Sequence, residues 1–455
     1  MEQWHGSTFM LSSIHFKFEI PKRIYFLAGL LLRLFLAPFL SHPFDMRVFM
    51  AVGAAVSQGI TPYGQYVLQD VFASTPHPHL YGVVPGIGYP PLWGLMEGFA
   101  RILSSAIAPN NLYAYVLTLK IPIIIGELLL AIVIYNILKA ETNERIATAT
   151  YLIFIFCPFI MAVGTIWGMF DAIALIFTLL AAYTLHRDWG KSSVFLAVAS
   201  ALKLFPLVLA PLYSLLVYKA VRSKKRAVNY AIHTILITGV LTFLPMIAFN
   251  WPTGNMYNAL AYHVTTSNPS YDVAAGFPYG AASPFNVFSL LVDVGGPAFQ
   301  PPNVLVYAWI PACIIIYFLL YRSRAMVPKG INLSADFSST VQWSLLLMLT
   351  LFTTRVWVSE QNLIFLFAFF TLSVFLQHPQ DWDKVELLWL LLFLFVLVHV
   401  PVVSFFWLPL PWTLTASTAF ADGPLGWTRL LIMTALTFSW LAMTWHYVAK
   451  KLRWS

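Results

Sequence analysis

Long apolar runs separated by short polar stretches extend along most of the chain, and this pattern predicts membrane-spanning helices. A helix rises about 1.5 Å per residue, so roughly 20 apolar residues cross the ~30 Å hydrocarbon core of a bilayer. Runs that meet or approach this length lie near residues 24–40, 112–138, 147–163, 170–186, 228–249, 303–321, 341–357, 361–377, 385–408 and 427–448. We therefore expect an all-α polytopic membrane protein of about 10–12 transmembrane helices, built as one integral membrane domain over residues 1–455.

Lysine and arginine are distributed unevenly between the two sides that this pattern defines. With a cytoplasmic N-terminus, 19 of the 26 basic residues fall on the cytoplasmic side, which is the bias that the positive-inside rule describes. Both termini are then cytoplasmic, and the long segments 41–111 and 250–302 are outer loops. The expected location is a cell membrane, or the endoplasmic reticulum membrane in a eukaryote.

The first outer loop contains the signals of two helices. Residues 46–58 are apolar enough to form a helix along the membrane interface that ends at the glycine and proline of 59–62. The sequence YPPLW (89–93) predicts a second helix with proline in its first turn. Tyr89, which precedes this helix, is a candidate to face a ligand.

Composition excludes a soluble protein. The chain is 59% hydrophobic and only 10% charged, far from the usage of soluble domains. Its net charge of +8 does not indicate nucleic-acid binding, because the basic residues flank the apolar runs, where anionic lipid headgroups are the expected partners. Cys157 and Cys313 lie within apolar runs, so we expect buried core residues and not a disulfide or a metal pair.

A few charged residues fall near the predicted outer membrane face. They are Asp45, Arg47, Asp171, Arg355 and Glu360. An ionisable group at the centre of a spanning helix costs roughly 2.5–3.5 kcal/mol, and less near the interface. Charges placed there in a chain with so few others are expected to have partners, either within the protein or in a substrate.

Lys203 lies in the pair of short apolar pieces that covers residues 192–218. The first piece has about 11 residues and rises only ~16 Å, half of the hydrocarbon core. Basic residues flank the pair on both sides, so we expect a broken helical hairpin with Lys203 and Pro206 at its apex. Lys203 could bind a phosphate, pair with Asp171, or extend its ammonium to the interface.

The other outer charges also allow more than one interpretation. Asp45 could cap the helix that follows it or act as a reactive carboxylate. Asp171 could cap the fourth span or bind substrate. Arg355 and Glu360 could form a salt bridge across the link RVWVSEQN (355–362), or both could bind substrate.

A metal site is also suggested by two histidines of the first outer loop. His77 and His79 occur in STPHPHL. Because no cysteine or carboxylate cluster accompanies them in the sequence, a surface loop is the favoured interpretation.

Several short motifs occur in a familiar order. Asp45 after the first span is followed by GITPYG (59–64), YPPLW, WGMFDA (167–172) and ALKLFP (201–206), and the second half contributes SEQN (359–362). This order resembles the GT-C superfamily of membrane glycosyltransferases. The mid-chain motifs are most similar to the GPI mannosyltransferase I catalytic subunit and to prokaryotic polyprenol-phosphate-mannose-dependent mannosyltransferases, and YPPL is similar to protein O-mannosyltransferases.

The resemblance implies a GT-C-like helical bundle and a defined activity. A hexose, with mannose as the expected sugar, would move with inversion from a polyprenyl-phosphate donor to a lipid-linked or glycan acceptor. Asp45 would be the general base, and Lys203 and Arg355 would bind the donor phosphate. The residues expected to contact substrate are Arg47, Tyr89, Asp171, Glu360 and Gln361.

The sequence departs from the family pattern in the first outer loop. The family commonly has a pair of acidic residues there, whereas this chain has Asp45 with Arg47 where the second acid would stand. A requirement for a divalent cation therefore stays open, although no metal ligands are assigned. A protein partner subunit stays open as well.

Two other classes of protein fit part of the pattern. A transporter or lipid flippase could use the same charges as a relay, but the long outer loops and the lack of a visible inverted repeat fit that class less well. A non-catalytic assembly subunit would keep the fold without the acid, and the presence of Asp45 disfavours it.

Overall fold

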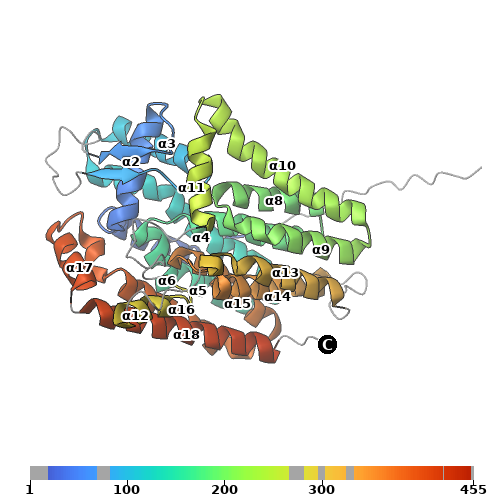
Figure 1. The fold of residues 1–455 in the computed structure, drawn as a ribbon. Coiled ribbons are helices and arrows are strands. Elements are labelled where there is room, and N and C mark those ends of the chain that lie inside the picture. The colour runs from blue at the N-terminus through green and yellow to red at the C-terminus, as the bar shows by residue number, and fades with distance from the viewer. Residues whose placement is uncertain are drawn as a thin grey trace, which may run out of the picture.

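The computed structural model describes residues 19–68, 82–265, 281–295, 303–323, 333–423 and 425–451. Figure 1 shows a bundle in which most long helices run roughly along one axis, and this confirms the predicted all-α class. Within the described residues one small sheet is present, in which β1 (Gln65–Val67) pairs antiparallel with β2 (Val83–Pro85). His77 and His79 lie outside the described residues.

Each of the ten predicted spans contains a helix. The helices are α1 (Arg23–Leu36), α4 (Leu112–Glu141), α5 (Glu144–Phe156), α7 (Asp171–Thr184), α10 (Lys224–Ala248), α13 (Trp309–Arg322), α14 (Leu333–Thr354), α15 (Leu363–Gln377), α16 (Trp382–His399) and α18 (Leu425–Lys451).

Six of the predicted spans are long and apolar enough to cross a membrane. They contain α4, α5, α10, α13, α15 and α18. The other four helices fall short for local reasons. α1 and α7 have 14 residues each, a rise of only about 21 Å, and α14 and α16 begin with polar or charged turns. The chain is nonetheless a multi-pass integral membrane protein.

The remaining helices connect and cover this bundle. They are α2 (Pro43–Ser57), α3 (Pro91–Ile107), α6 (Pro158–Met161), α8 (Trp189–Leu202), α9 (Leu209–Val221), α11 (Thr253–Thr265), α12 (Asn286–Gly295) and α17 (Trp412–Asp422). Helix α2 begins and ends within three residues of the predicted 46–58, and α3 begins within the YPPLW motif as predicted. α2 packs along α3 and buries most of its side chains against protein.

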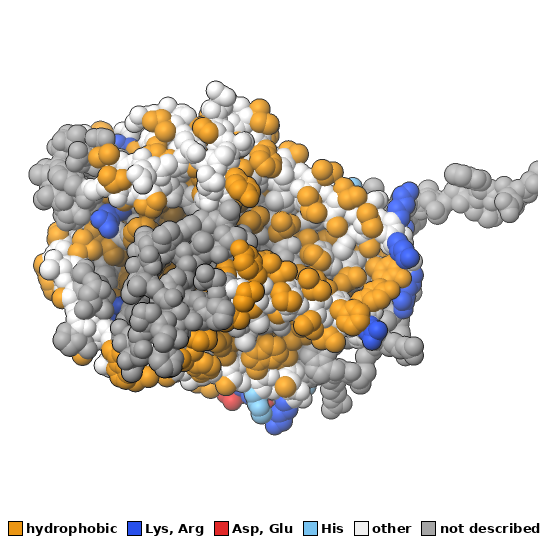
Figure 2. Space-filling model, viewed as in Figure 1, with side chains coloured by type: hydrophobic (Ala, Val, Ile, Leu, Met, Phe, Trp, Pro, Cys, Tyr) orange, Lys and Arg blue, Asp and Glu red, His pale blue; other side chains and the backbone are white. Residues whose placement is uncertain are grey.

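Burial separates the centre of the bundle from its lipid-facing flank. Every residue of α15 from Leu363 to Phe375 is buried. By contrast α10 and α13 expose large apolar side chains, among them Leu236, Leu244 and Phe318. These helices form part of the hydrophobic surface visible in Figure 2. Large exposed apolar side chains on long helices are typical of a surface that faces lipid.

The two ends of the bundle differ in kind. Helices α2, α3 and α17 and the small sheet lie at one end in Figure 1. A column of Lys and Arg side chains lies at the other end in Figure 2, where α9 ends and α10 begins. The segments expected outside and the basic residues expected inside are thus at opposite ends of the molecule.

The chain breaks its helical path at Lys203. α8 ends at Leu202, Lys203 has an extended backbone, and a short 3-10 turn (Phe205–Val208) leads into α9. Pro206 lies in that turn, where its missing N–H does not interrupt a longer helix. α10 packs against both α8 and α9. The break places the Lys203 side chain beside the first turn of α7.

Candidate functional site

Two adjoining cavities lie near the end of the bundle that carries α2 and α3. The larger, about 680 Å³, is lined by Asp45, by the β1–β2 region and by Asn255 and Asn258 of α11. The smaller, about 420 Å³, is lined by Lys203, Arg355 and mostly apolar or aromatic side chains. Gly88 and Tyr89 line both. Tyr89 therefore separates a cavity that contains a carboxylate from one that contains two cations.

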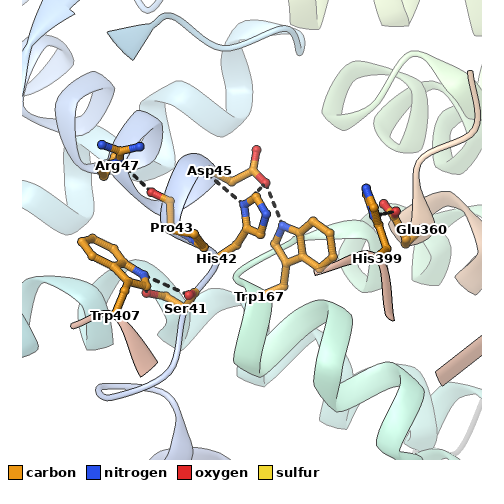
Figure 3. A network of polar contacts seen from close by, with 9 residues as sticks. All are labelled: Ser41, His42, Pro43, Asp45, Arg47, Trp167, Glu360, His399 and Trp407. Atoms are coloured by element: carbon orange, nitrogen blue, oxygen red, sulfur yellow. Dashed lines mark hydrogen bonds and ion pairs between the residues drawn. The ribbon is translucent and has the colours of Figure 1, made fainter. Parts of the chain in front are cut away.

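Asp45 lies in the first turn of α2, held by two aromatic nitrogens. The indole N–H of Trp167 donates to Asp45 Oδ2 over 2.7 Å, and His42 Nδ1 lies 2.8 Å from the same oxygen. In Figure 3 the other carboxylate oxygen points away from both partners. That oxygen is placed to accept a hydrogen bond from a molecule in the larger cavity.

His42 is also the residue that caps α2. Its Nδ1 accepts a hydrogen bond from the backbone N–H of Asp45 over 3.2 Å, so His42 and not Asp45 is the cap. One ring nitrogen cannot accept from an N–H and donate to a carboxylate at the same time. The two contacts of Nδ1, with the Asp45 N–H and with Asp45 Oδ2, are therefore alternatives.

The partner Trp167 is presented by an unusual turn of the chain. Residues Ala162–Trp167 form a π-helix, and Gly168 follows with φ 110°. This positive φ favours glycine, because residues with a Cβ rarely adopt it. The indole then stacks on His42, with ring centroids 4.3 Å apart. Insertions of this kind often occur at functional sites.

The environment of Asp45 favours its ionised form. Burial alone would raise the pKa of this carboxyl, but the charge of His42, the hydrogen bonds from His42 and Trp167, and the more distant Lys203 lower it. The net pKa is below the ordinary value. Tyr89 shows the opposite effect, since burial and the nearby carboxylates of Asp45 and Asp171 raise the pKa of its hydroxyl.

Lys203 and Asp171 form a buried ion pair. Lys203 Nζ lies 2.5 Å from Asp171 Oδ1, and the two side chains are 7% and 1% exposed. The ammonium also lies over the rings of Tyr89 and Phe170, 5.3 and 5.6 Å from their centroids. Asp171 Oδ2 is buried and has no hydrogen-bond partner among the described residues. The pairing that the sequence left as an alternative for Lys203 is therefore present, and Lys203 still lines the smaller cavity.

The rest of the lining of the smaller cavity includes both polar and apolar side chains. Arg355, Gln361 and Asn362 come from the link between α14 and α15. Phe205, Val208, Leu260, Trp309, Tyr317 and Leu351 form the apolar part of the lining. Such a cavity can hold a molecule with an anionic end and a hydrocarbon chain.

Two predicted substrate contacts lie elsewhere. Arg47 donates from Nε to the carbonyl of Pro43 over 2.8 Å and points away from Asp45 in Figure 3, since residues two apart on a helix do not share a face. Glu360 contacts the ring of His399. Neither Arg47 nor Glu360 is among the residues that line the two cavities, and their contact with substrate stays a prediction.

Sequence reasoning missed His42, Trp167 and His399. His42 stands three residues before Asp45, a spacing at which two side chains can meet at the start of a helix, and Trp167 opens the motif WGMFDA. Both residues therefore had a local signal in the sequence. His399 approaches Trp167, with ring centroids 6.4 Å apart, only because α16 packs beside the π-helix. No local pattern marks that contact.

A metal site would need more ligands than these. Among the described residues, no group of three or more His, Cys, Asp or Glu side chains is placed to hold a metal ion. His42 and Asp45 are a two-residue set whose atoms already contact one another.

The chain has little detectable similarity in sequence to known proteins. No protein-family model matches the chain, and no curated protein sequence matches it significantly. One solved structure, ArnT from Cupriavidus metallidurans bound to undecaprenyl phosphate, is similar over 94% of this chain and 77% of that chain, with 13% identity and a TM-score of 0.46. A similarity at this level does not define the family of this chain.

Proposed function

We propose that the protein is a membrane glycosyltransferase that moves a hexose, with mannose as the expected sugar, from a polyprenyl-phosphate donor to a hydroxyl of a lipid-linked or glycan acceptor. The observation that carries this proposal is the meeting of two cavities at Tyr89, one with the Asp45 carboxylate and one with the Lys203 and Arg355 cations. The GT-C-like order of motifs supports the same function.

The smaller cavity suits the donor. Lys203 and Arg355 can stabilise a phosphate, and their contribution grows as negative charge develops on the departing phosphate. The apolar residues of the lining can take the first prenyl units, which arrive from the lipid. The exposed apolar flank of α13 lies on the same helix as Trp309 and Tyr317 of this lining.

The larger cavity suits the acceptor. An acceptor hydroxyl hydrogen-bonded to Asp45 would lose its proton to the carboxylate as its oxygen attacks the anomeric carbon. The bond from that carbon to the donor phosphate oxygen breaks with both electrons, and the phosphate leaves with them. One displacement of this kind inverts the anomeric centre and needs no covalent enzyme intermediate. Asn255 and Asn258 can hydrogen-bond further hydroxyls of the acceptor.

The proposed function also assigns the site to one side of the membrane. Both cavities are lined by Gly88 and Tyr89, which directly precede α3 at the end of the bundle away from the basic column. The site would therefore face the outer or lumenal side while both termini are cytoplasmic. In this proposal Asp45 lies near the membrane surface because the sugar donor comes from the lipid.

The test separates the two cavities by substitution. Asp45→Asn keeps the shape of the side chain but removes the base, so turnover with a radiolabelled polyprenyl-phosphate mannose and a membrane lipid extract should fall about 10²–10⁴-fold. Donor binding, measured by scintillation proximity, should stay near wild type. Arg355→Met should weaken donor binding instead.

Arg47→Met provides the matched control. It also removes an arginine at this end of the molecule, but the Arg47 side chain points away from Asp45. It should leave both measurements near wild type. Turnover of Asp45→Asn within a few-fold of wild type would contradict the role of Asp45. Vectorial lipid movement without release of polyprenyl phosphate would identify a flippase.

A further inference from the structure

Lys120 is a fully buried lysine of α4 that the proposed chemistry does not use. Its side chain is 0% exposed. Its ammonium donates to the carbonyl oxygen of Leu40 and, over 2.9 Å, to that of Ile166. These two carbonyls belong to the two chain segments that meet at Asp45: the link between α1 and α2, and the π-helix that ends at Trp167.

The two carbonyls come from different kinds of segment. Ile166 is in the last turn of the π-helix, where carbonyl groups lack partners within the helix. Leu40 lies in the link between α1, which ends at Leu36, and α2. Because a buried carbonyl needs a hydrogen-bond donor, one ammonium satisfies a group from each segment and joins the two.

A second residue of α4 holds the same π-helix from two turns away. Glu127 accepts from the backbone N–H of Thr165 over 2.7 Å and from its hydroxyl over 2.8 Å. A Cβ at Gly164 would stand 1.7 Å from Glu127 Oε1, so the glycine makes room for the carboxylate. Lys120 and Glu127 are seven residues apart and share one face of α4.

The joint held by Lys120 continues directly into the site. The backbone N–H of His42 donates to the carbonyl of Trp167 over 3.0 Å. The residue after Leu40 is also fixed, since Trp407 donates to Ser41 from its indole nitrogen. Movement between the two segments would therefore change the distance from Trp167 to Asp45.

We propose that Lys120 is a positioning residue for Asp45: by binding Leu40 and Ile166 it fixes the register between the α1–α2 link and the π-helix, and so holds Trp167 and His42 against the carboxylate. The effect on turnover rests on the proposed glycosyltransferase function. The effect on the contact between Trp167 and Asp45 does not.

The test observes that contact directly. The full-length protein is labelled with 5-fluorotryptophan in detergent micelles, and Trp167→Phe identifies the Trp167 signal among the 16 tryptophans. In Lys120→Met the fluorine resonance of Trp167 should move toward its position in Asp45→Ala. Lys120→Arg, which keeps a cation, should return it toward wild type. Turnover of Lys120→Met should fall about ten- to hundredfold through kcat, with KM for the donor near wild type.

Lys219→Met is the matched control. Lys219 is also a buried lysine whose ammonium donates to a backbone carbonyl, that of Ser323, but it lies in the last turn of α9. This variant should leave the Trp167 resonance unchanged. An unmoved Trp167 resonance in folded Lys120→Met would overturn the proposal, as would an equal displacement in Lys219→Met.

Two further outcomes are informative. If Lys120→Met does not fold, Lys120→Gln retains a donor for the carbonyls and is measured instead; failure of both to fold would assign Lys120 to folding and reject the positioning role. The Trp167 resonance could shift in Lys120→Met while the wild-type protein transfers no sugar. That result would leave the positioning role intact and reject the proposed function.

Discussion

Two buried ion pairs lie within this bundle, and their surroundings differ. Arg33 Nε lies 2.5 Å from Glu127 Oε2, with both side chains fully buried. Arg33 also donates to the carbonyls of Gly29 and Ile155, and both oxygens of Glu127 accept hydrogen bonds from Thr165. Lys203 and Asp171 are equally close, but Lys203 lines a cavity. Each pair leaves one buried atom, Arg33 Nη2 or Asp171 Oδ2, without a hydrogen-bond partner among the described residues.

The two ion pairs differ in what surrounds them: the first is enclosed by protein, and the second borders a cavity. A buried pair is stable only when further hydrogen bonds replace the lost hydration of both ions. Arg33 and Glu127 make further hydrogen bonds to α1, α5 and the π-helix, so their role is to hold these elements and α4 together. The Lys203 pair differs because Lys203 lines a cavity, as expected if a ligand completes the pair.

The largest effect is expected from breaking the first pair. Arg33→Met leaves a carboxylate buried without its cation, which costs about 3–5 kcal/mol in comparable pairs. We expect a large drop in the yield of monodisperse protein and in the melting temperature in detergent. Arg33→Met with Glu127→Gln should recover much of that loss, because the uncompensated charge is gone.

The exposed pair of Lys139 and Glu19 provides the control for this experiment. These side chains are 34% and 36% exposed, and solvent screens their interaction. Lys139→Met should leave the melting temperature nearly unchanged. If the double variant at 33 and 127 melted no higher than the single variant, the electrostatic explanation would be rejected.

The second pair should respond differently to the same treatment. Lys203→Met should weaken binding of the polyprenyl-phosphate donor about tenfold or more, the usual worth of a hydrogen bond to a charged group. Lys203→Met with Asp171→Asn should restore the melting temperature but not donor binding or turnover. Recovery of activity in this double variant would show that Lys203 only neutralises Asp171, and would remove the contrast between the two pairs.

The smallest effect concerns Asp45, a half-buried acid that contacts aromatic nitrogens, whereas Glu127 and Asp171 each contact a Lys or Arg side chain. Trp167→Phe removes the 2.7 Å hydrogen bond to the ionised carboxylate. That bond lowers the pKa of Asp45, so its loss should raise this pKa. Because the base must be ionised to act, the acid limb of kcat/KM should move to higher pH. The rate well above that limb should fall by no more than in Lys120→Met, because phenylalanine can keep the stacking on His42.

Trp251→Phe is the matched control for the pH profile. The indole N–H of Trp251 donates to the carbonyl of Gly59, which lies beyond the end of α2 opposite to Asp45. Its acid limb should coincide with that of wild type. A limb that moves to lower pH in Trp167→Phe would contradict the role of the indole.

Much of the fold could be predicted from the sequence because its signals are local. An apolar run long enough to span a bilayer is visible in any window of about 20 residues, and each of the ten runs contains a helix. The break at Lys203 followed from the length of the apolar piece before it, and the start of α3 followed from the prolines of YPPLW. The sequence also identified Asp45, Lys203, Asp171 and Arg355 as charges that needed partners.

Only the tertiary structure decided which partners those charges have. Trp167 reaches Asp45 across 122 residues of chain, and Lys203 reaches Asp171 across 32. Arg47, so close to Asp45 in sequence, points away because the helix turns between them. A charged residue within an apolar run of sequence indicates that a charge is buried, which costs free energy unless another group compensates for the lost hydration. Which group compensates it depends on how separate helices pack, and no local window of sequence contains that information.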